Sequence, residues 1–228
     1  MSIHTLTLKK ITNRMNDVQN KRNIGFPIRS MEDYGEIYYT PFNNTIEIYF
    51  SGSDFEYKDW FGSSGNLNYF DKDFNGVHDG FQKAYHNIQH QIYAYFDWIL
   101  YHKLTFEKRK SLSIRISGYS RGGALATICS ADIKKKFSDF TMLDPVLFGT
   151  PPVFNEKAKI KYLFLGITPI RVINGWDIVT TSRLYKEVDL HHVGIPYKLY
   201  QPFWHLLLSM KIKDHFFESG YLKNINKL

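Results

Sequence analysis

Residues 112–137, LSIRISGYSRGGALATICSADIKKKF, combine two hydrophobic periodicities around one short turn. Leu112, Ile114 and Ile116 alternate with polar residues, as in a half-buried strand. From Gly122 to Phe137 the apolar residues instead recur at helical spacing. The stretch is therefore interpreted as a strand that runs directly into a helix, the unit from which sheets covered by helices are built.

The turn between the two is Gly118-Tyr119-Ser120-Arg121-Gly122, a Gly-x-Ser-x-Gly pentapeptide. Alone the pattern is a weak signal, because glycine and serine are common. Its position strengthens it, since a nucleophile elbow needs a strand, a sharp turn and a helix that begins at once. The helix N-terminus would also direct free N–H groups and its positive dipole end toward the serine. We interpret Ser120 as a candidate nucleophile rather than as part of an ordinary glycine-rich turn.

Similar patterns recur along the chain. Helices are expected over about 6–19, 80–101 and 122–137, and strands at 36–39, 45–50, 112–118, 146–149, 171–174 and 188–193. Strands that alternate with helices predict an α/β fold with a mostly parallel central sheet flanked by helices. No repeat, low-complexity tract or linker divides the sequence, so we expect a single domain over residues 1–228.

Composition agrees with a packed core. Of the 228 residues, 43% are hydrophobic and 17% aromatic, which excludes a disordered chain. A single cysteine, Cys129, excludes an intrachain disulfide framework and a cysteine-based zinc site.

The charge balance is basic, because 29 Lys and Arg against 22 Asp and Glu leave 29 − 22 = +7. The positive residues form short basic clusters at 108–110 and 134–136. The sequence has no continuous basic stripe and no nucleic-acid-binding motif. Nucleic acid is therefore excluded as a partner. We interpret the basic clusters as parts of the solvent-exposed surface, with peripheral attraction to an anionic membrane as the alternative.

The N-terminus lacks the basic start and apolar run of a signal peptide, and the longest apolar stretch, near 203–210, is too short to span a bilayer. These features predict an intracellular chain without a transmembrane segment. The abundance of Lys, Asn, Ile, Tyr and Phe is typical of an AT-rich genome, which makes a viral or parasitic source a hypothesis.

An elbow serine needs an acid and then a base, in the order Ser, Asp or Glu, His. Asp177 follows the strand predicted at 171–174, the usual place for such an acid. Asp144 precedes its predicted strand and Asp189 lies inside one, so Asp177 is the preferred candidate.

Nine histidines compete for the base. His215 is favoured because it follows every predicted strand, whereas His192 lies at the end of one. The residues alone leave His192 and His205 open as alternatives.

Several blocks now add up to a resemblance. The chain resembles the class 3 lipases, the fungal-lipase-like branch of the α/β-hydrolases. The matching sequence blocks occur in the same order as in that family. The matching blocks are Ile48-Tyr49-Phe50-Ser51-Gly52-Ser53 with Asp59-Trp60, Val77-His78-Asp79-Gly80-Phe81, residues 117–126, Phe148-Gly149-Thr150-Pro151 with Asn155, Arg171-Val172-Ile173-Asn174 with Asp177 and Val179, His192-Val193-Gly194, and Asp214-His215-Phe216.

The resemblance implies roles for particular positions. Ser120 would be the nucleophile, Asp177 the acid and His215 the base. The backbone N–H of Arg121, with the backbone N–H and hydroxyl of Ser53, would form the oxyanion hole. Residues 54–66 occupy the place of the family's lid and carry large rings that would cover the cleft or contact substrate: Phe55, Tyr57, Trp60 and Phe61.

Three positions depart from the family pattern. Tyr119 replaces the usual His before the nucleophile, and Arg121 replaces the Leu after it. A cationic side chain beside the cleft would change the preferred lipid headgroup. Ser51 replaces the Arg at the strand end, which removes a structural ion pair.

The implied activity is hydrolysis of carboxylic esters of lipids, as by a triacylglycerol lipase or esterase, at a lipid–water interface. No metal or organic cofactor is expected for this chemistry. A phospholipase A1-type esterase of polar lipids is the first alternative. A catalytically inactive lipid-binding protein is the second, and a peptidase or acyltransferase on the same fold is the third.

Overall fold

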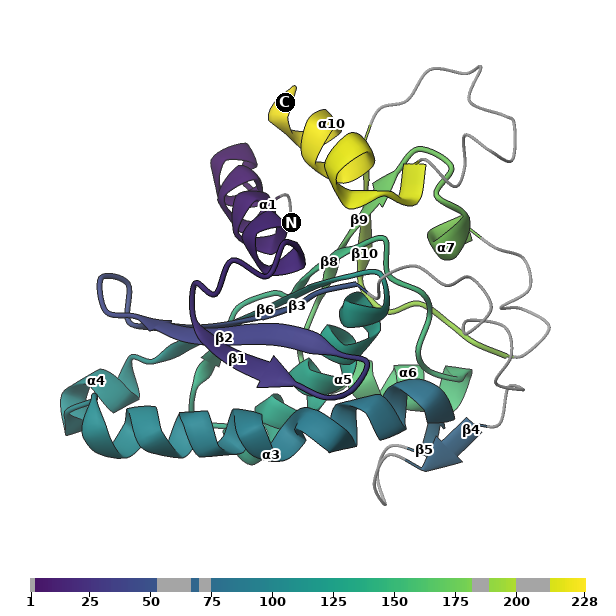
Figure 1. Ribbon diagram of the computed structural model, residues 1–228. Helices are drawn as coiled ribbons and strands as arrows, with labels where there is room; N and C mark the ends of the chain where they lie inside the picture. Colours follow the sequence, from purple (N-terminus) through teal and green to yellow (C-terminus); the bar gives the residue numbers. More distant parts are fainter. Residues whose placement is uncertain (1–2, 53–66, 70–74, 182–188, 200–213) are drawn as a thin grey trace.

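The computed structural model describes residues 3–52, 67–69, 75–181, 189–199 and 214–228 (Figure 1). Its centre is a sheet with the strand order β1-β2-β3-β6-β8-β9-β10, with β7 paired to the start of β6. The strands are β1 (Phe26–Arg29), β2 (Tyr34–Thr40), β3 (Thr45–Phe50), β6 (Ser113–Tyr119), β7 (Thr141–Met142), β8 (Val146–Phe148), β9 (Ile170–Asn174) and β10 (Ile195–Leu199).

Most of this sheet is parallel. β1, β2 and β3 pair antiparallel, while every pairing from β3 through β10 is parallel. Parallel neighbours need crossover connections, which helices supply. The helices that connect the strands from β3 to β9 are α3 (Asp79–His102), α4 (Phe106–Lys110), α5 (Arg121–Lys136) and α6 (Glu156–Leu163). A separate two-stranded sheet joins β4 (Leu67–Tyr69) to β5 (Asn75–His78).

Helices cover both faces of the central sheet. α3, α5 and α6 pack on one face, where they share a single hydrophobic cluster with the strands. On the other face α1 (Thr5–Gln19) lies beside η1 (Phe217–Leu222) and α10 (Lys223–Asn226), so the two ends of the chain meet (Figure 1). A short helix, α7 (Ile178–Thr181), follows β9. The predicted α/β fold with a mostly parallel, helix-flanked sheet is confirmed.

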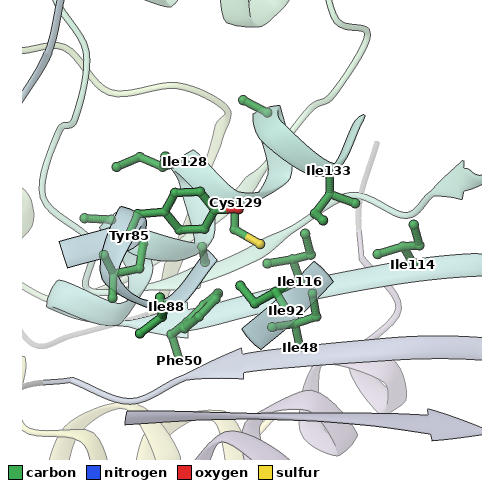
Figure 2. Close-up of a cluster of buried hydrophobic side chains, with 14 of the residues drawn as sticks. Ile48, Phe50, Tyr85, Ile88, Ile92, Ile114, Ile116, Ile128, Cys129 and Ile133 are labelled. Atoms are coloured by element: carbon green, nitrogen blue, oxygen red, sulfur yellow. The ribbon is translucent and has the colours of Figure 1, made fainter. Parts of the chain in front are cut away.

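The core between the sheet and its helices follows from the alternation in the sequence. Every second residue of β3 and β6 points at α3 and α5. The apolar side chains on one face of each helix pack against these strand residues (Figure 2). The side chains that meet there, each no more than 1% exposed, include Ile48, Phe50, Tyr85, Ile88, Ile92, Ile114, Ile116, Ile128, Cys129 and Ile133. Full burial of one such aliphatic side chain stabilises the fold by about 1.5–3 kcal/mol.

One predicted strand is wrong. Among residues 189–193 the structure has only an isolated bridge, between His191 and Phe154, and the last strand lies at Ile195–Leu199 instead. Asp189 adopts a positive φ of 52° in a turn, which interrupts the extended pattern. The true strand contains Pro196 and lies at the edge of the described sheet, where a missing N–H is tolerated.

The described helices include none that combines the length and the apolar character needed to cross a bilayer.

Candidate active site

Ser120 lies between the last residue of β6 and the first residue of α5. Its φ of 56° and ψ of −125° are unusual for a side chain other than glycine, and such a conformation costs on the order of 1–3 kcal/mol. The Ser120 N–H donates to the carbonyl of Phe148 at 2.8 Å, which holds the turn against β8. A Cβ on Gly122 would collide with the carbonyls of Phe50 and Ser51, so the close approach requires glycine there.

A continuous hydrogen-bonded chain runs from this serine. The Oγ of Ser120 lies 2.8 Å from Nε2 of His215, and Nδ1 of His215 lies 2.9 Å and 3.0 Å from the two carboxylate oxygens of Asp177. All three side chains are buried. Because Nδ1 faces a carboxylate, it carries the proton, which leaves Nε2 free to accept one from Ser120. The structure thus brings together three residues that the sequence places up to 95 positions apart.

The carboxylate of Asp177 is held by further donors. The N–H of Val179 donates to Oδ1 at 2.8 Å, and the hydroxyl of Tyr221, from η1, makes a short hydrogen bond to Oδ2. Burial raises the pKa of Tyr221, and the charge of Asp177 raises it further, so Tyr221 remains a neutral donor. Tyr221 could not be found from the sequence, because no local pattern marks a tyrosine that contacts a residue 44 positions away.

Gly149 leaves room for these groups. It has a φ of 57°, and a Cβ there would lie 2.9 Å from Oδ2 of Asp177, 3.0 Å from the hydroxyl of Tyr221 and 3.2 Å from Cε1 of His215. Both the positive φ and the crowding require glycine. The sequence block around Phe148-Gly149 therefore shapes the site.

Tyr119 contacts the histidine from the other side. Its hydroxyl donates to the backbone carbonyl of His215 at 2.5 Å, and its ring stacks on the imidazole with centroids 5.2 Å apart. Burial, followed by the charge of Asp177, raises the pKa of Tyr119 and keeps the hydroxyl protonated. The departure from the usual His at this position thus creates a contact to His215.

The segment that carries His215 is tied to the end of β9. The side-chain amide of Asn174 donates to the carbonyl of Asp214 at 2.8 Å, and the N–H of Trp176 donates to the Asp214 carboxylate at 3.0 Å. Asn224 of α10 donates to Oδ1 of Asn174 at 2.8 Å. These bonds connect the β9 loop to the C-terminal helices and so fix where the imidazole lies.

The side chain of Arg121 is paired within the protein. Its Nε lies 2.7 Å from Oδ1 of Asp33, and its guanidinium also reaches Glu32 at 3.1 Å. Burial alone would lower the pKa of Arg121, but its pairing with Asp33 and Glu32 raises it. The expectation that this cation serves a lipid headgroup therefore has no support from the geometry. The backbone N–H of Arg121 lies in the first turn of α5, where no intrahelical partner exists.

An ion pair does exist beside the strand end, although Ser51 has replaced the arginine of the family pattern. The hydroxyl of Ser51 donates to the carbonyl of Tyr34 at 2.9 Å. Tyr34 directly follows Asp33, the partner of Arg121. The Arg121–Asp33 ion pair therefore lies next to the residue that Ser51 contacts.

The rival candidates do not join the chain of hydrogen bonds. The Nε2 of His192 donates to the carbonyl of Thr180 at 3.2 Å, and burial, reinforced by the charge of Arg171, lowers its pKa to about 3. Asp189 lies on an exposed turn, 2.7 Å from the ring of His191.

Part of the predicted site falls outside the described residues. This applies to one oxyanion candidate, to the four lid rings and to one alternative base: Ser53, Phe55, Tyr57, Trp60, Phe61 and His205. Within the described ranges no group of His, Cys, Asp and Glu is arranged to hold a metal ion.

The central part of the chain matches a known protein family. The sequence profile of Lipase (class 3) matches residues 48–186, which is more than half of the chain. This chain belongs to the class 3 lipase family. Membership implies a hydrolase of carboxylic esters, and the match covers the strand end at β3, the elbow and Asp177.

Two curated relatives of this class 3 lipase come from Arabidopsis thaliana. Phospholipase A(1) DAD1, chloroplastic, is 35% identical over 69 residues, which cover 30% of this chain and 15% of the relative. Phospholipase A1-Igamma1, chloroplastic, is 33% identical over 82 residues, which cover 33% and 16%. The matched segments thus span about a sixth of the length of these relatives.

Solved structures of fungal lipases share the fold of this class 3 lipase. The lipase from Rhizopus microsporus var. chinensis superposes with a TM-score of 0.71 at 16% identity, over 89% of this chain and 78% of that one. The triacylglyceride lipase of Rhizomucor miehei gives 0.68 at 17% identity, over 88% and 83%. The predicted α/β-hydrolase fold is therefore confirmed.

Proposed function

We propose that this class 3 lipase hydrolyses carboxylic esters of lipids, with Ser120 as nucleophile, His215 as general base and Asp177 as the supporting acid. The observation that carries the proposal is the buried chain from Ser120 Oγ through the imidazole to the Asp177 carboxylate, with distances of 2.8–3.0 Å. A strained strand-to-helix turn presents the serine, as the chemistry of a nucleophile elbow requires.

The reaction follows from these positions. Nε2 of His215 accepts the hydroxyl proton as the Ser120 oxygen attacks the ester carbonyl, and the same proton is passed to the departing alcohol. Asp177 holds the imidazole in the required tautomer and stabilises its cation. Water then attacks the acyl-enzyme with His215 as base, which releases the fatty acid and restores the serine.

The oxyanion of the tetrahedral intermediate needs donors that are in place beforehand. We propose the backbone N–H of Arg121 as one donor, since it lies in the first turn of α5 directly after Ser120. Ser53 remains the second proposed donor on the resemblance alone. Each such donor contributes about 3–4 kcal/mol to transition-state stabilisation. The rings of residues 54–66 remain proposed as the lid.

A neutral glyceride is the proposed substrate. The fungal neighbour from Rhizomucor miehei is described as a triacylglyceride lipase. The charge of Arg121 is compensated by Asp33 and Glu32, so this residue supplies no free cation for a phosphate group. Both observations favour an uncharged ester.

A phospholipase A1-type activity is the second candidate, because both Arabidopsis relatives carry that name. A headgroup panel separates the two. Rates are compared on triacylglycerol and phosphatidylcholine with the same acyl chains, presented in the same detergent. Faster release from triacylglycerol supports the first proposal, and faster release of the sn-1 acyl chain from phosphatidylcholine supports the second.

Labelling with a fluorescent fluorophosphonate tests the triad directly. The wild type is labelled beside Ser120→Ala, His215→Ala and His192→Ala, the last serving as a control for loss of a half-buried histidine. Loss of labelling in the first two and its retention in His192→Ala is expected. A folded wild type that resists labelling, with detergent or lipid present, would instead indicate an inactive lipid-binding protein.

A further inference from the structure

Exposed aromatic rings gather beside cations at the C-terminal end of α3 and on α4. We define the aromatic–cationic patch by the rings of Trp98 and Tyr101 on α3 and Phe106 on α4, with the cations Lys103, Arg109 and Lys110. It includes two of the three residues of the basic cluster at 108–110, which the proposed function does not use. The patch lies where α3 turns into α4 (Figure 1).

Each ring of the patch is paired with one cation. The Nζ of Lys103 lies 5.0 Å from the ring centre of Trp98, and the Nζ of Lys110 lies 4.4 Å from that of Phe106. The guanidinium of Arg109, on α4, lies 5.9 Å from the ring of Tyr101, on α3, so the two helices form one surface. Cations at these distances from a ring face are attracted to it. Within the described residues none of the three has a carboxylate partner.

The rings are open to solvent. Tyr101 is 74% exposed, Phe106 64% and Trp98 47%. The apolar surface continues across Tyr95, whose ring lies 5.9 Å from that of Trp98 and 5.7 Å from that of Phe26 on the neighbouring strand β1. Adjacent exposed rings of this kind mark a binding surface.

The charge of the patch identifies the kind of partner. Between residues 95 and 111 there are four Lys and Arg against two acidic residues, so the local excess is 4 − 2 = +2. Tryptophan and tyrosine favour the interface between water and lipid, and nearby lysine and arginine are drawn to acidic headgroups. We propose that the patch docks this protein onto the surface of an anionic phospholipid bilayer.

This contact is separate from the site of hydrolysis. The amide of Asn44, at the start of β3, donates to the carbonyl of Lys108 at 2.7 Å, which fixes α4 beside the beginning of β3 and β6. Ser120 follows the other end of β6, a seven-residue strand that spans roughly 20 Å. A protein docked through the patch therefore holds the nucleophile away from the bound bilayer, and its ester substrate arrives from solution or from a facing lipid surface.

Vesicle sedimentation tests the proposal. All proteins carry Ser120→Ala, so that no lipid is hydrolysed and the result does not depend on the proposed catalytic activity. Binding is measured on phosphatidylcholine vesicles with and without phosphatidylserine, at low and high salt. We expect binding only with phosphatidylserine, weakened by salt because exposed charges are screened.

Two double variants locate the contact. Lys103→Gln/Lys110→Gln, at two exposed positions, should weaken binding about 25-fold, since each cation near an anionic surface contributes about fivefold. Trp98→Ala/Phe106→Ala should reduce it further at high salt, where the apolar contribution remains. Lys157→Gln/Lys161→Gln and Phe164→Ala, on and after α6, are the matched controls for charge and for an exposed ring, and both should bind as the parent does.

Several results would overturn the proposal. Absence of binding to phosphatidylserine vesicles would do so, as would equal weakening by patch and control variants. Thermal unfolding of each variant is measured beside the binding, and the exposed substitutions should leave the midpoint unchanged. Fluorophosphonate labelling of the patch variants with Ser120 intact should match the wild type, because the patch lies apart from the serine.

Discussion

The hydroxyl of Tyr119 donates to the backbone carbonyl of His215 at 2.5 Å while its ring stacks against the imidazole of the same residue. One side chain thus restrains both the main chain and the ring of the proposed base. Tyr119 also directly precedes Ser120, so the end of β6 positions the nucleophile and its partner together. A ring at Tyr119 fills the space beside Gly52, where a Cβ would lie 2.7 Å from it.

Replacement of Tyr119 by Phe keeps the stacking and removes the hydrogen bond. Because an ordinary hydrogen bond contributes about 0.5–1.5 kcal/mol, we expect kcat on a water-soluble ester to fall about 2- to 10-fold with KM unchanged. Tyr119→Ala, which also loses the ring, should fall further. If Tyr119→Phe matches the wild type and only Tyr119→Ala is impaired, the ring alone positions His215.

Tyr221→Phe removes the hydroxyl that reaches Asp177 and leaves a buried carboxylate with fewer donors. Hydrogen bonds to charged groups are worth about 1.5–3 kcal/mol, so we expect kcat to fall roughly 10- to 100-fold and the free energy of unfolding to decrease by about 1–3 kcal/mol. Steady-state kinetics and urea unfolding measure the two effects. Tyr197→Phe on β10 is the matched control, and an equal loss of activity there would refute the specific role of Tyr221.

The central unit of the fold was predictable because its signals are local. Alternation in β6, helical spacing in α5 and the paired glycines of the elbow all lie within 26 consecutive residues. The edge strands β1 and β10 were not found, since Pro27 and Pro196 weaken the strand pattern and only their place at the edge of the described sheet makes them acceptable.

The site was predictable in its chain order and less so in its contacts. Order along the sequence favours Asp177 and His215, and the family resemblance selects His215 as the base. In the structure His192 is turned toward Thr180 instead. The contact of Tyr221 with Asp177 joins elements distant in sequence, and no periodicity reports such a contact. No sequence pattern indicates the pairing of Arg121 with Asp33, so the sequence alone places the charge of Arg121 beside the cleft.

The variant Arg121→Leu tests the pairing of Arg121 with Asp33. It restores the residue usual in the family and leaves Asp33, a buried carboxylate, without its cation. Loss of one partner of a buried pair costs about 3 kcal/mol, so the free energy of unfolding should fall by about that amount. The ratio of rates on phosphatidylcholine and triacylglycerol should not change. The double variant Arg121→Leu/Asp33→Leu should recover most of the stability, and a shifted headgroup ratio in the folded single variant would contradict the internal pairing.

His192 makes stability depend on pH. Burial, with the charge of Arg171, lowers its pKa in the folded protein to about 3, below the usual 6.5. Nδ1 is buried, and the described part of the chain offers it no hydrogen-bond partner, so a proton there would be unsatisfied. As the pH falls through 6.5 the unfolded chain takes up a proton that the folded protein excludes. Folding is therefore destabilised progressively between about pH 6.5 and pH 3, by up to about 1.4 kcal/mol per pH unit.

His192→Gln should remove this dependence. From about pH 7 to pH 5 the wild type should lose about 2 kcal/mol more stability than the variant, because one histidine with these two pKa values accounts for that difference. Urea unfolding at a series of pH values measures it. His90→Gln on the exposed side of α3 controls for removal of a histidine as such. Parallel stability curves for the wild type and His192→Gln would show that the half-buried imidazole is protonated in the folded protein, contrary to the contacts found for its two nitrogens.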